Sequence, residues 1–518
     1  MMAEGVVITD VDAGGVATRW DKVQDSKACV TATWIISVIP PVIFTIYVAQ
    51  FGINVPQADE WTRVPLVTSA LEGHLSLSAV WSQWLEYRLP VPNLVFIVDG
   101  YVAHFSSRSL MFFDAAIFTI GYYGVLLVYR QYTAGRLNPI NVVVLASVWF
   151  SLANAQNALW GFVVAWYVIP ACFIWMVFSL MMPKSHHWLW FTLAAILAVC
   201  ASYSMIQGFL LWPIGILCLL WVGPWTRRTA IRVSAWLGIG VVTAGLYFIG
   251  FNFKNLGCPG CSDSFSFSHP ASALHWLTVL VGNIVPTGFY QDYFQPSFST
   301  GWQELTGILV LVAAVAVVVQ SLRERSYSQR PPLPLLLVIF GFLFDLMITY
   351  GRASIGVLSA TSNRYEMPNL LIFLGIVAFV LAHLPSPKRP PSGQIRQWVI
   401  RWMATVVVFG FLVTQVWVST SFAIESGRLS RIVQTTAGRV VVNLDRIPSG
   451  ERSCALYALV WQGLLTPQGA LAYSTPIING MALHHLGLFE PGTYARLRAA
   501  GPPIIPGNCS PPMSSSAK

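Results

Sequence analysis

Long apolar runs separated by short polar segments most constrain how this chain can fold. A membrane-spanning helix needs about 20 predominantly apolar residues, and the sequence holds enough such runs for many spans. Only 10% of its 518 residues are charged, whereas soluble proteins average about 25%. The sequence therefore predicts an all-α polytopic membrane protein with about eleven transmembrane helices.

The predicted spans are bounded by polar or turn-forming residues. They cover residues 32–51, 109–129, 139–154, 162–182, 188–204, 206–222, 233–251, 302–321, 332–350, 367–383 and 399–419. Two further apolar stretches, 89–105 and 274–289, are short and interrupted by Pro, Gly or Asp. We expect these two to lie in, or dip into, the outer membrane interface.

The basic residues between the spans indicate the orientation. They cluster in alternate loops, in which Glu324 is the only acid, and cytoplasmic loops carry such an excess of Lys and Arg. We therefore expect a cytoplasmic N-terminus, and the polar residues that precede the first span argue against a cleaved signal peptide. Because the basic residues are divided among short loops, the net charge of +9 does not indicate nucleic-acid binding.

This layout divides the chain into three parts. Residues 1–31 form a cytoplasmic tail, and residues 32–420 form a transmembrane module whose first outer loop covers 52–108. Residues 421–518 are more polar and rich in Pro and Gly, so they predict a small exported domain with a disordered end.

The cysteines are also divided between the two sides of the membrane in this layout. Cys258, Cys261, Cys454 and Cys509 all fall in predicted outer segments. The "CPGC" at 258–261 predicts a local disulfide, and Cys454 with Cys509 a second one. A zinc site or a redox-active CxxC is the alternative for the first pair.

Two adjacent acids, Asp59 and Glu60, follow the first span in "FGINVPQADEWTRVPL". Around them, "EWTRVPLVTSALEG" and "SLSAVWSQWLEY" have apolar residues at helical spacing and predict amphipathic surface helices. The acids serve either as a catalytic carboxylate pair or as caps of a surface helix, since acids stabilise helix N-termini by about 0.3–1 kcal/mol.

The order of these features resembles the GT-C membrane glycosyltransferases, specifically the protein O-mannosyltransferase and lipid A aminoarabinose-transferase superfamily. In that family the first outer loop carries an Asp-Glu pair, then a Pro-containing helix, then an Arg that opens the second span. Asp59-Glu60, Leu89-Pro90-Val91-Pro92 and Arg108 occupy these places, and the resemblance extends to about Arg130.

The chain is also similar to a group of bacterial membrane proteins with "DEW", "HR.P", "Q.ALWGF" and "SRY" signatures. These are matched at 59–61, 87–90, 156–162 and 363–365. Where that group has "NEHR", this chain has "LEYR", so Tyr87 replaces a histidine.

The resemblance implies transfer of a sugar from a polyprenyl-phosphate donor to an exported glycan, lipid or protein. Asp59 is then the candidate base, and Glu60 orients it or the acceptor. A single carboxylate suffices, because the leaving phosphate needs no protonation, and such base catalysis is typically worth about 10²–10⁴-fold.

Cations for a donor phosphate are available in "YGRASIGVLSATSNRYEMPN" at 350–369. Arg352 and Arg364 stand at opposite ends of a run of small residues, and Tyr365 follows directly. The planar guanidinium suits phosphate oxygens, although lipid headgroups would also attract it. Asp345 lies two helical turns before Arg352, and we expect it to support this segment from within the membrane.

Residues for the sugar or the acceptor come from the first outer loop and from "NAQNALWGF" at 154–162. The candidates are Trp61, Glu86, Arg88, Gln156, Asn157 and Trp160. Amides bond hydroxyl groups and indoles stack on sugar rings, but both are also common at membrane interfaces. The first outer loop has no spaced DxD pair, so no metal or other cofactor is predicted.

The sequence thus predicts a GT-C glycosyltransferase of a bacterial inner membrane, with its C-terminal domain periplasmic or extracellular. Its partners would be a polyprenyl-phosphate-linked sugar, an envelope acceptor and membrane lipid. A lipid-linked-sugar flippase or other transporter would rely on the intramembrane acids instead. A non-catalytic assembly protein would use the acids as caps, and an O-antigen polymerase would place its arginines in large later loops.

Overall fold

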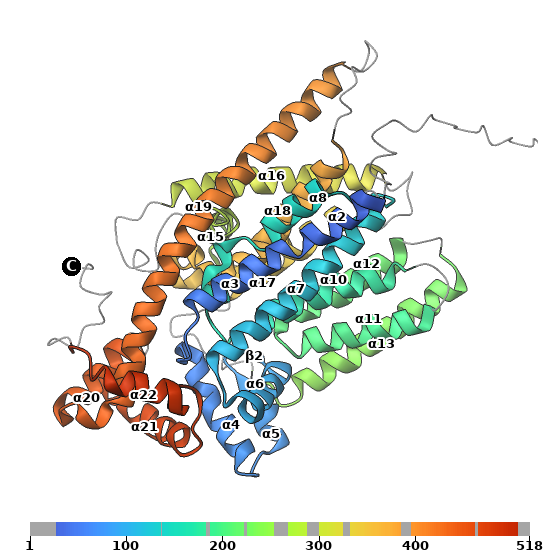
Figure 1. Cartoon of the computed structure of the whole chain (residues 1–518). Helices are drawn as coiled ribbons and strands as arrows, with labels where there is room; N and C mark the ends of the chain where they lie inside the picture. The colour runs from blue at the N-terminus through green and yellow to red at the C-terminus, as the bar shows by residue number, and fades with distance from the viewer. Residues whose placement is uncertain are drawn as a thin grey trace, which may run out of the picture.

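The structure is a computed structural model that describes residues 27–135, 137–182, 187–221, 225–252, 268–286, 300–324, 332–384, 395–461 and 465–505. Within these ranges the chain is almost entirely helical, with one short two-stranded hairpin. Figure 1 shows the helices gathered in one bundle, with smaller helices at the end where α4, α5 and α20–α22 lie. The protein is an all-α polytopic membrane protein.

The helices of the bundle follow the predicted spans. They are α2 (Lys27–Ser37), α3 (Ile39–Phe51), α7 (Ser107–Tyr132), α8 (Pro139–Trp149), α10 (Val164–Leu180), α11 (His187–Ser202), α12 (Leu211–Trp221), α13 (Arg227–Phe248), α16 (Gly301–Glu324), α17 (Leu333–Arg352), α18 (Glu366–Ala382) and α19 (Ile395–Val442). In the part of the chain that the structure describes, eight helical segments are long and apolar enough to cross a membrane. The predicted spans at 162–182, 188–204 and 206–222 are shorter apolar helices.

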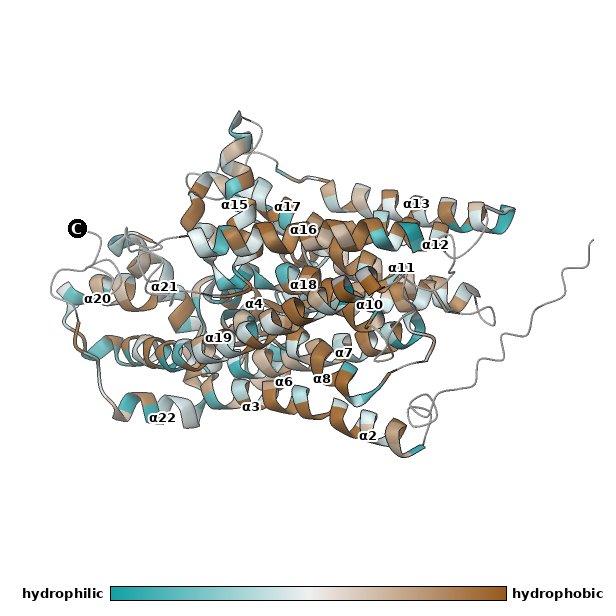
Figure 2. Ribbon diagram, turned by 90° about the horizontal axis from the view of Figure 1, so that it is seen from above, coloured by the Kyte–Doolittle hydropathy of each residue, from teal (hydrophilic) through white to brown (hydrophobic). Residues whose placement is uncertain are grey.

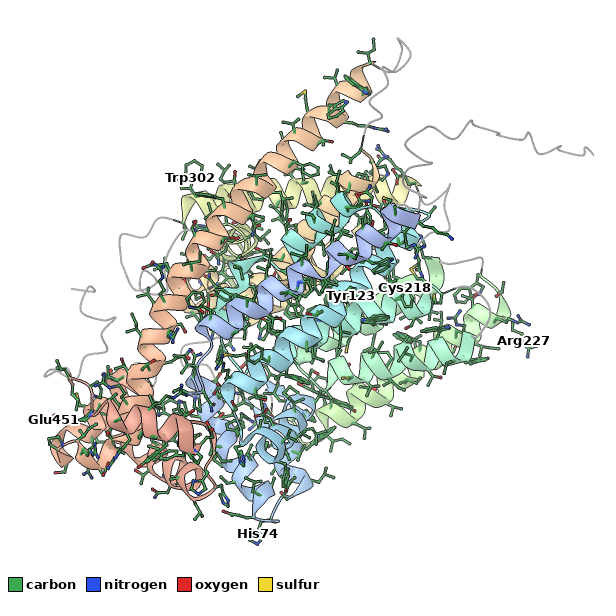
Figure 3. All side chains as sticks on the ribbon, viewed as in Figure 1. His74, Tyr123, Cys218, Arg227, Trp302 and Glu451 are labelled. Atoms are coloured by element: carbon green, nitrogen blue, oxygen red, sulfur yellow. The ribbon has the colours of Figure 1, made fainter. Side chains whose placement is uncertain are left out.

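Apolar side chains cover both the interior and the outer face of the bundle. Phe118 and Trp149 stack at 4.9 Å in the core, while Val241 of α13 and Val312 of α16 are exposed. The hydropathy colouring in Figure 2 shows brown along the middle of these helices. Trp302, at the start of α16, is 72% exposed and points out of the bundle in Figure 3. Such a distribution is expected where lipid replaces water around a bundle.

The stretch predicted to lie at the interface near 274–289 forms α15 (Pro270–Gly282), which packs closely on α16. A Cβ added at Gly282 would lie 1.7 Å from the Gln303 carbonyl oxygen, and one at Gly307 would lie 1.8 Å from that of Thr278. Only glycine permits backbones to approach so closely, so these two positions set the packing of α15 on α16.

The first long loop, residues 52–106, is folded into short elements. They are η1 (Ala58–Arg63), α4 (Val64–Leu71), α5 (Leu77–Val80), β1 (Gln83–Trp84), β2 (Tyr87–Arg88) and α6 (Pro90–Ala103). The first predicted surface helix corresponds to η1 and α4. Proline at the first position of α6 has the φ angle that a helix start requires.

The prediction of a second surface helix, for "SLSAVWSQWLEY", is wrong after the first turn. The chain leaves α5 and forms an antiparallel hairpin that pairs Gln83 with Arg88 and Trp84 with Tyr87. Leu85 in the turn has φ +51°. The Gln83 side chain bonds both backbone groups of Asn252, at 2.8 and 3.0 Å. This distant partner favours the strand, and the local apolar spacing could not reveal it.

Helix α19 continues without interruption past residue 420 to Val442. Its 48 residues make a rod of about 70 Å, more than twice the thickness of a bilayer core of about 30 Å. Figure 1 shows it crossing the bundle and ending among α20 (Ser449–Ala455), α21 (Pro467–Leu483) and α22 (Pro491–Ala499). The small C-terminal helices are therefore carried on the end of a membrane helix.

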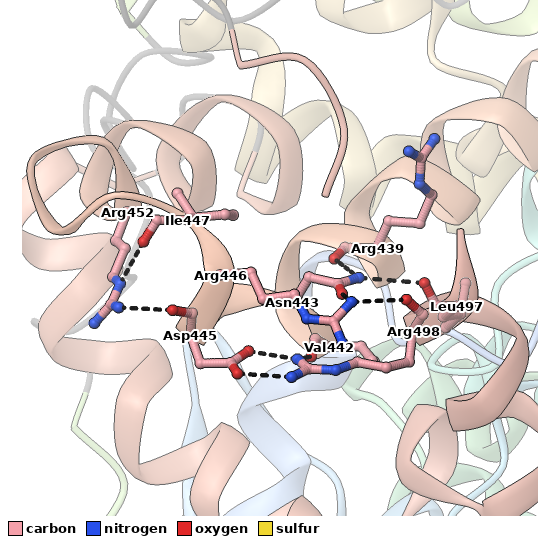
Figure 4. A network of polar contacts seen from close by, with 9 residues as sticks. All are labelled: Arg439, Val442, Asn443, Asp445, Arg446, Ile447, Arg452, Leu497 and Arg498. Atoms are coloured by element: carbon pink, nitrogen blue, oxygen red, sulfur yellow. Dashed lines mark hydrogen bonds and ion pairs between the residues drawn. The ribbon is translucent and has the colours of Figure 1, made fainter. Parts of the chain in front are cut away.

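A polar network fastens α22 to the end of α19 (Figure 4). Arg498 forms an ion pair with Asp445 and donates to the Val442 carbonyl oxygen at 2.8 Å. Asn443 donates to the Leu497 carbonyl oxygen at 3.2 Å. The Arg498 guanidinium lowers the pKa of Asp445 to about 2. These bonds satisfy carbonyl groups at the ends of both helices, which lack helical partners there.

Cys454 is disulfide-bonded, as predicted. Its predicted partner Cys509 and the pair Cys258 and Cys261 lie outside the described residues, so the pairing itself stays a prediction. Cys172, Cys200 and Cys218 are free thiols.

Candidate functional site

The adjacent acids Asp59 and Glu60 have different environments. Both lie on η1, a turn of 3-10 helix that follows the first span. Glu60 is fully buried, whereas Asp59 is partly exposed. Only one of the two carboxylates is therefore available to a molecule arriving at this loop.

Glu60 caps η1. One of its carboxylate oxygens accepts the Gln57 backbone N–H at 3.3 Å, as the third residue of a capping box does. Its other oxygen lies under Gly161, and the Ser107 side chain acts on the carboxyl group by hydrogen bonding. Burial raises the pKa of Glu60 to about 8, because the charged form is poorly solvated there. The capping interpretation thus applies to Glu60, which carries little charge at neutral pH.

The Asp59 side chain does not cap η1, and it lies near three arginines. Burial raises the pKa of its carboxyl above the ordinary value, and the guanidinium groups of Arg364, Arg63 and Arg352 act against that rise, in this order of strength. Arg63 lies on the same short helix as Asp59, whereas Arg352 and Arg364 come from the segment at 350–369. The tertiary structure therefore brings Asp59 together with both arginines predicted to hold a phosphate.

Arg63, the third arginine, was not predicted as a site residue. It is 5% exposed, and its guanidinium lies over the Trp84 ring at 4.4 Å. Its Nη2 has no hydrogen-bond partner in the described part of the chain. A signal was present in the sequence, since Arg63 stands four residues after Asp59 at the end of the same short helix.

Arg352 is held by the hairpin of the first long loop. Glu86, in the turn between β1 and β2, forms an ion pair with it across 266 residues of sequence. Burial raises the pKa of Glu86, and Arg352 acts against that rise. The sequence proposed Glu86 for the acceptor, but the structure pairs it with a proposed donor residue.

Arg364 and Tyr365 form a second cationic group. The Arg364 guanidinium lies over the Tyr365 ring at 4.7 Å and donates to its hydroxyl at 2.6 Å. Its Nε is buried without a hydrogen-bond partner, and no carboxylate of the described ranges lies within ion-pair distance of it. The Arg364 side chain therefore retains the capacity to bind an anion.

The "NAQNALWGF" segment connects the carboxylate loop with the Arg364 segment. Asn157 donates to the Arg364 carbonyl oxygen at 2.9 Å. Trp160 donates from its indole N–H to the Gln57 carbonyl oxygen at 3.2 Å, and Gln57 donates back to Leu159 at 2.6 Å. Asn157 and Trp160 were predicted to face a sugar, but both are buried and hydrogen-bonded within the protein. Gln156 remains partly exposed.

Two other predicted residues are also used internally. Arg88 is buried and donates to the carbonyl oxygens of Trp81 and Ile249, each at 2.7 Å. Trp61 is 2% exposed and belongs to the hydrophobic core. Arg108 at the start of α7 donates to the Ala49 carbonyl oxygen at 2.9 Å, which ties the second span to the first.

Asp345 does not form the expected polar network to Arg352. It is fully buried in α17, and neither of its carboxylate oxygens has a hydrogen-bond partner among the described residues. Glu366, which lies near enough to interact with it electrostatically, accepts hydrogen bonds from Asn283 and Asn369 instead.

Two tyrosines complete the surroundings of Asp59. Tyr87, on β2, interacts electrostatically with Asp59 and Arg364. Tyr473, on α21 of the C-terminal helices, interacts with Arg63 and Asp59. Over the described ranges, no group of three or more His, Cys, Asp or Glu residues is placed to hold a metal ion.

Comparison with known proteins gives only partial structural similarity. No family model matches the sequence, and no curated protein matches it. A solved structure, the archaeal oligosaccharyltransferase AglB from Archaeoglobus fulgidus in complex with an inhibitory peptide and a dolichol-phosphate, is similar to 82% of this chain, with 12% identity and a TM-score of 0.42. The match covers 59% of that chain. A likeness of this size establishes no shared activity.

Proposed function

We propose that this protein is a membrane glycosyltransferase of the GT-C type. It takes a sugar from a polyprenyl-phosphate donor and transfers it to a glycan, lipid or protein at the outer face of a bacterial inner membrane. The observation that carries this proposal is the position of Asp59, a partly exposed carboxylate on which three arginines act.

The reaction needs a base and a stabilised leaving group. An acceptor hydroxyl oxygen forms a bond to the anomeric carbon, and its proton passes to the Asp59 carboxylate. The bond from that carbon to the phosphate oxygen breaks, and the phosphate keeps the electron pair. Arg364 and Arg352 hold the phosphate, since a guanidinium offers paired N–H groups to its oxygens.

Four other predicted residues support this arrangement of the base and the arginines. Glu60 caps η1 and fixes the direction of Asp59, while Tyr365 holds the Arg364 guanidinium. Asn157 and Trp160 join the two loops. The order of features around Asp59 also matches the family that the first long loop resembles.

Transport of a lipid-linked sugar is a second candidate. Asp345 is buried in a membrane helix without a hydrogen-bond partner in the described ranges, next to the buried Glu366. Such intramembrane acids are costly and commonly belong to proton or substrate pathways. A transporter of this kind would depend on Asp345 and would tolerate replacement of Asp59.

The two candidates are separated in the source organism. Surface glycans and polyprenyl-linked sugars are profiled by mass spectrometry in a deletion strain that carries wild type, Asp59→Asn or Asp345→Asn at equal abundance. We expect wild type and Asp345→Asn to restore one missing sugar and Asp59→Asn to leave it missing. Restoration by Asp59→Asn together with failure of Asp345→Asn would replace the transferase by the transporter.

A further inference from the structure

We propose that the C-terminal helix α21 completes the acceptor side of the site, and that Tyr473 is the surface on which a sugar ring of the acceptor lies. This inference rests on the proposed function and names the acceptor class as carbohydrate. Its starting point is the way in which α21 lies along the first long loop.

Two contacts fix the register of α21 on α4. His484 approaches Glu72 at 3.1 Å, and a Cβ added at Gly480 would lie 3.2 Å from a methyl carbon of Thr68. In each of the two helices, these contacts are four residues apart, which is about one helical turn. Helix α21 therefore runs alongside α4 in the same direction, with matching residues 412 positions apart in sequence.

The first half of α21 lies near the site. Tyr473 stands seven residues, or two turns, before Gly480 and on the same face of α21. The chain before Thr68 leads back through the start of α4 to the short helix that carries Asp59 and Arg63. The electrostatic interactions of Tyr473 with Arg63 and Asp59 agree with this placement.

Tyr473 is the exposed member of the aromatic residues around Arg63 and Asp59. Among the described residues, Phe162 is buried, and Trp84 and Tyr87 are only partly exposed. Tyr473 is 40% exposed, and its ring packs against Trp461 at 5.5 Å between centroids. Trp461 is itself held by a bond from its indole N–H to the Ser474 hydroxyl at 2.7 Å. The Tyr473 ring is thus supported on one side.

This chemistry suits a carbohydrate. Asn157 and Trp160 are buried and hydrogen-bonded within the protein. The Asn157 amide is therefore not available to bond a sugar hydroxyl, and the Trp160 ring is not available to stack on a sugar. A tyrosine ring offers an apolar face with a polar edge, and a pyranose ring has apolar C–H faces bordered by hydroxyl groups. A sugar ring lying on Tyr473 would be held near Asp59, the proposed base, with which Tyr473 interacts electrostatically.

The experiment uses the full-length protein in the deletion strain described above, with four variants matched for abundance. They are Tyr473→Ala, Tyr473→Phe, Asp59→Asn and Leu483→Ala. Leu483 lies on the same helix and is 71% exposed, and at 100° per residue its side chain is displaced by about 80° around the helix from that of Tyr473. The readouts are the transferred sugar and the polyprenyl-linked sugar that copurifies with the protein, both by mass spectrometry.

We expect Tyr473→Ala to lower the transferred sugar about 10-fold, because a supported stacking contact is lost. Copurified donor lipid should stay at the wild-type level, since the donor arginines are intact. Leu483→Ala should transfer normally, because Leu483 is not part of the proposed sugar surface. Tyr473→Phe keeps the ring that makes the contact, so its transfer should exceed that of Tyr473→Ala. The attachment point of the sugar should be another carbohydrate.

Three results would contradict these expectations, and each would overturn a different claim. Normal transfer by Tyr473→Ala while Asp59→Asn is inactive would overturn the role of Tyr473 and leave the transferase intact. Attachment of the sugar to a peptide or lipid group without a carbohydrate would overturn the acceptor class. Normal transfer by Asp59→Asn would overturn the proposed function and this inference with it.

Discussion

Asn157 donates a hydrogen bond from its side-chain amide to the Arg364 carbonyl oxygen at 2.9 Å, across 207 residues of sequence. The same segment reaches the carboxylate loop through the bond from Trp160 to Gln57. Residues 154–162 therefore connect the loop that carries the proposed base with the segment that carries the proposed phosphate-binding arginine.

Replacing Asn157 by Ala should loosen the Arg364 segment. Loss of a buried hydrogen bond costs about 1–3 kcal/mol of stability, and we expect copurified donor lipid to fall about 10-fold. Asn138→Ala is the control, because it removes the N-cap of α8, which lowers stability by about 1 kcal/mol away from the arginines. Equal donor loss in both variants would contradict a specific role for Asn157.

Asp59 and Glu60 should respond differently to the loss of charge. Asp59→Asn removes the proposed base and should lower transfer by about 10²–10⁴-fold. Glu60→Gln keeps an oxygen for the Gln57 N–H and resembles the uncharged form that burial favours, so transfer should stay within about 10-fold of wild type. The measurement is the rate of sugar transfer in membranes, at equal abundance. A larger loss with Glu60→Gln than with Asp59→Asn would reverse the assignment.

Glu60 should also make stability depend on pH. Because burial raises its pKa to about 8 from 4.5, the folded protein keeps a proton that the unfolded chain releases above about pH 4.5. The free energy of unfolding should therefore fall as the pH rises from about 4.5 to 8, by on the order of a few kcal/mol, and then level off.

Thermal unfolding in detergent, followed from pH 5 to 9, tests this. Glu60→Gln cannot ionise and should become more stable than wild type at pH 9, with a similar melting temperature at pH 5. Parallel pH profiles for the two proteins would show that Glu60 is not the titrating group.

Removal of the Cys454 disulfide should destabilise the C-terminal helices. Such bonds typically contribute about 2–4 kcal/mol, so Cys454→Ser should increase proteolysis of residues 443–505 under mild conditions. If Cys509 is the partner, Cys509→Ser gives the same result and the double variant adds nothing. Peptide mapping without reduction identifies the partner directly, and a Cys454 peptide linked to Cys258 or Cys261 would contradict the predicted pairing.

Local patterns were sufficient to predict the bundle. A membrane span depends on the hydropathy of about 20 consecutive residues, so the apolar runs predicted every long helix, from α3 through α19, and also the short helices α6 and α15. The hairpin at 83–88 was not predicted, because its residues are held by Asn252 and Arg352, and the local spacing shows neither partner.

The candidate site shows the same division. The sequence placed Asp59, Glu60, Arg352 and Arg364 in loops at one end of the predicted spans, since topology alone assigns those loops to one side. It could not tell the two acids apart, because adjacent residues share a hydropathy pattern but not a side-chain direction. In the folded protein Gly161 packs over Glu60, which is fully buried, while Asp59 stays partly exposed.

The sequence by itself therefore determined the membrane class, the order of the helices and the residue types available at one end of the bundle, all of which depend on neighbours along the chain. Tertiary structure decided which of these residues meet. It brought Arg63 and Tyr473 to Asp59, paired Glu86 with Arg352, and turned Asn157 and Trp160 into internal supports. These relationships depend on contacts between distant residues, such as the His484–Glu72 contact across 412 positions, and no local pattern contains them.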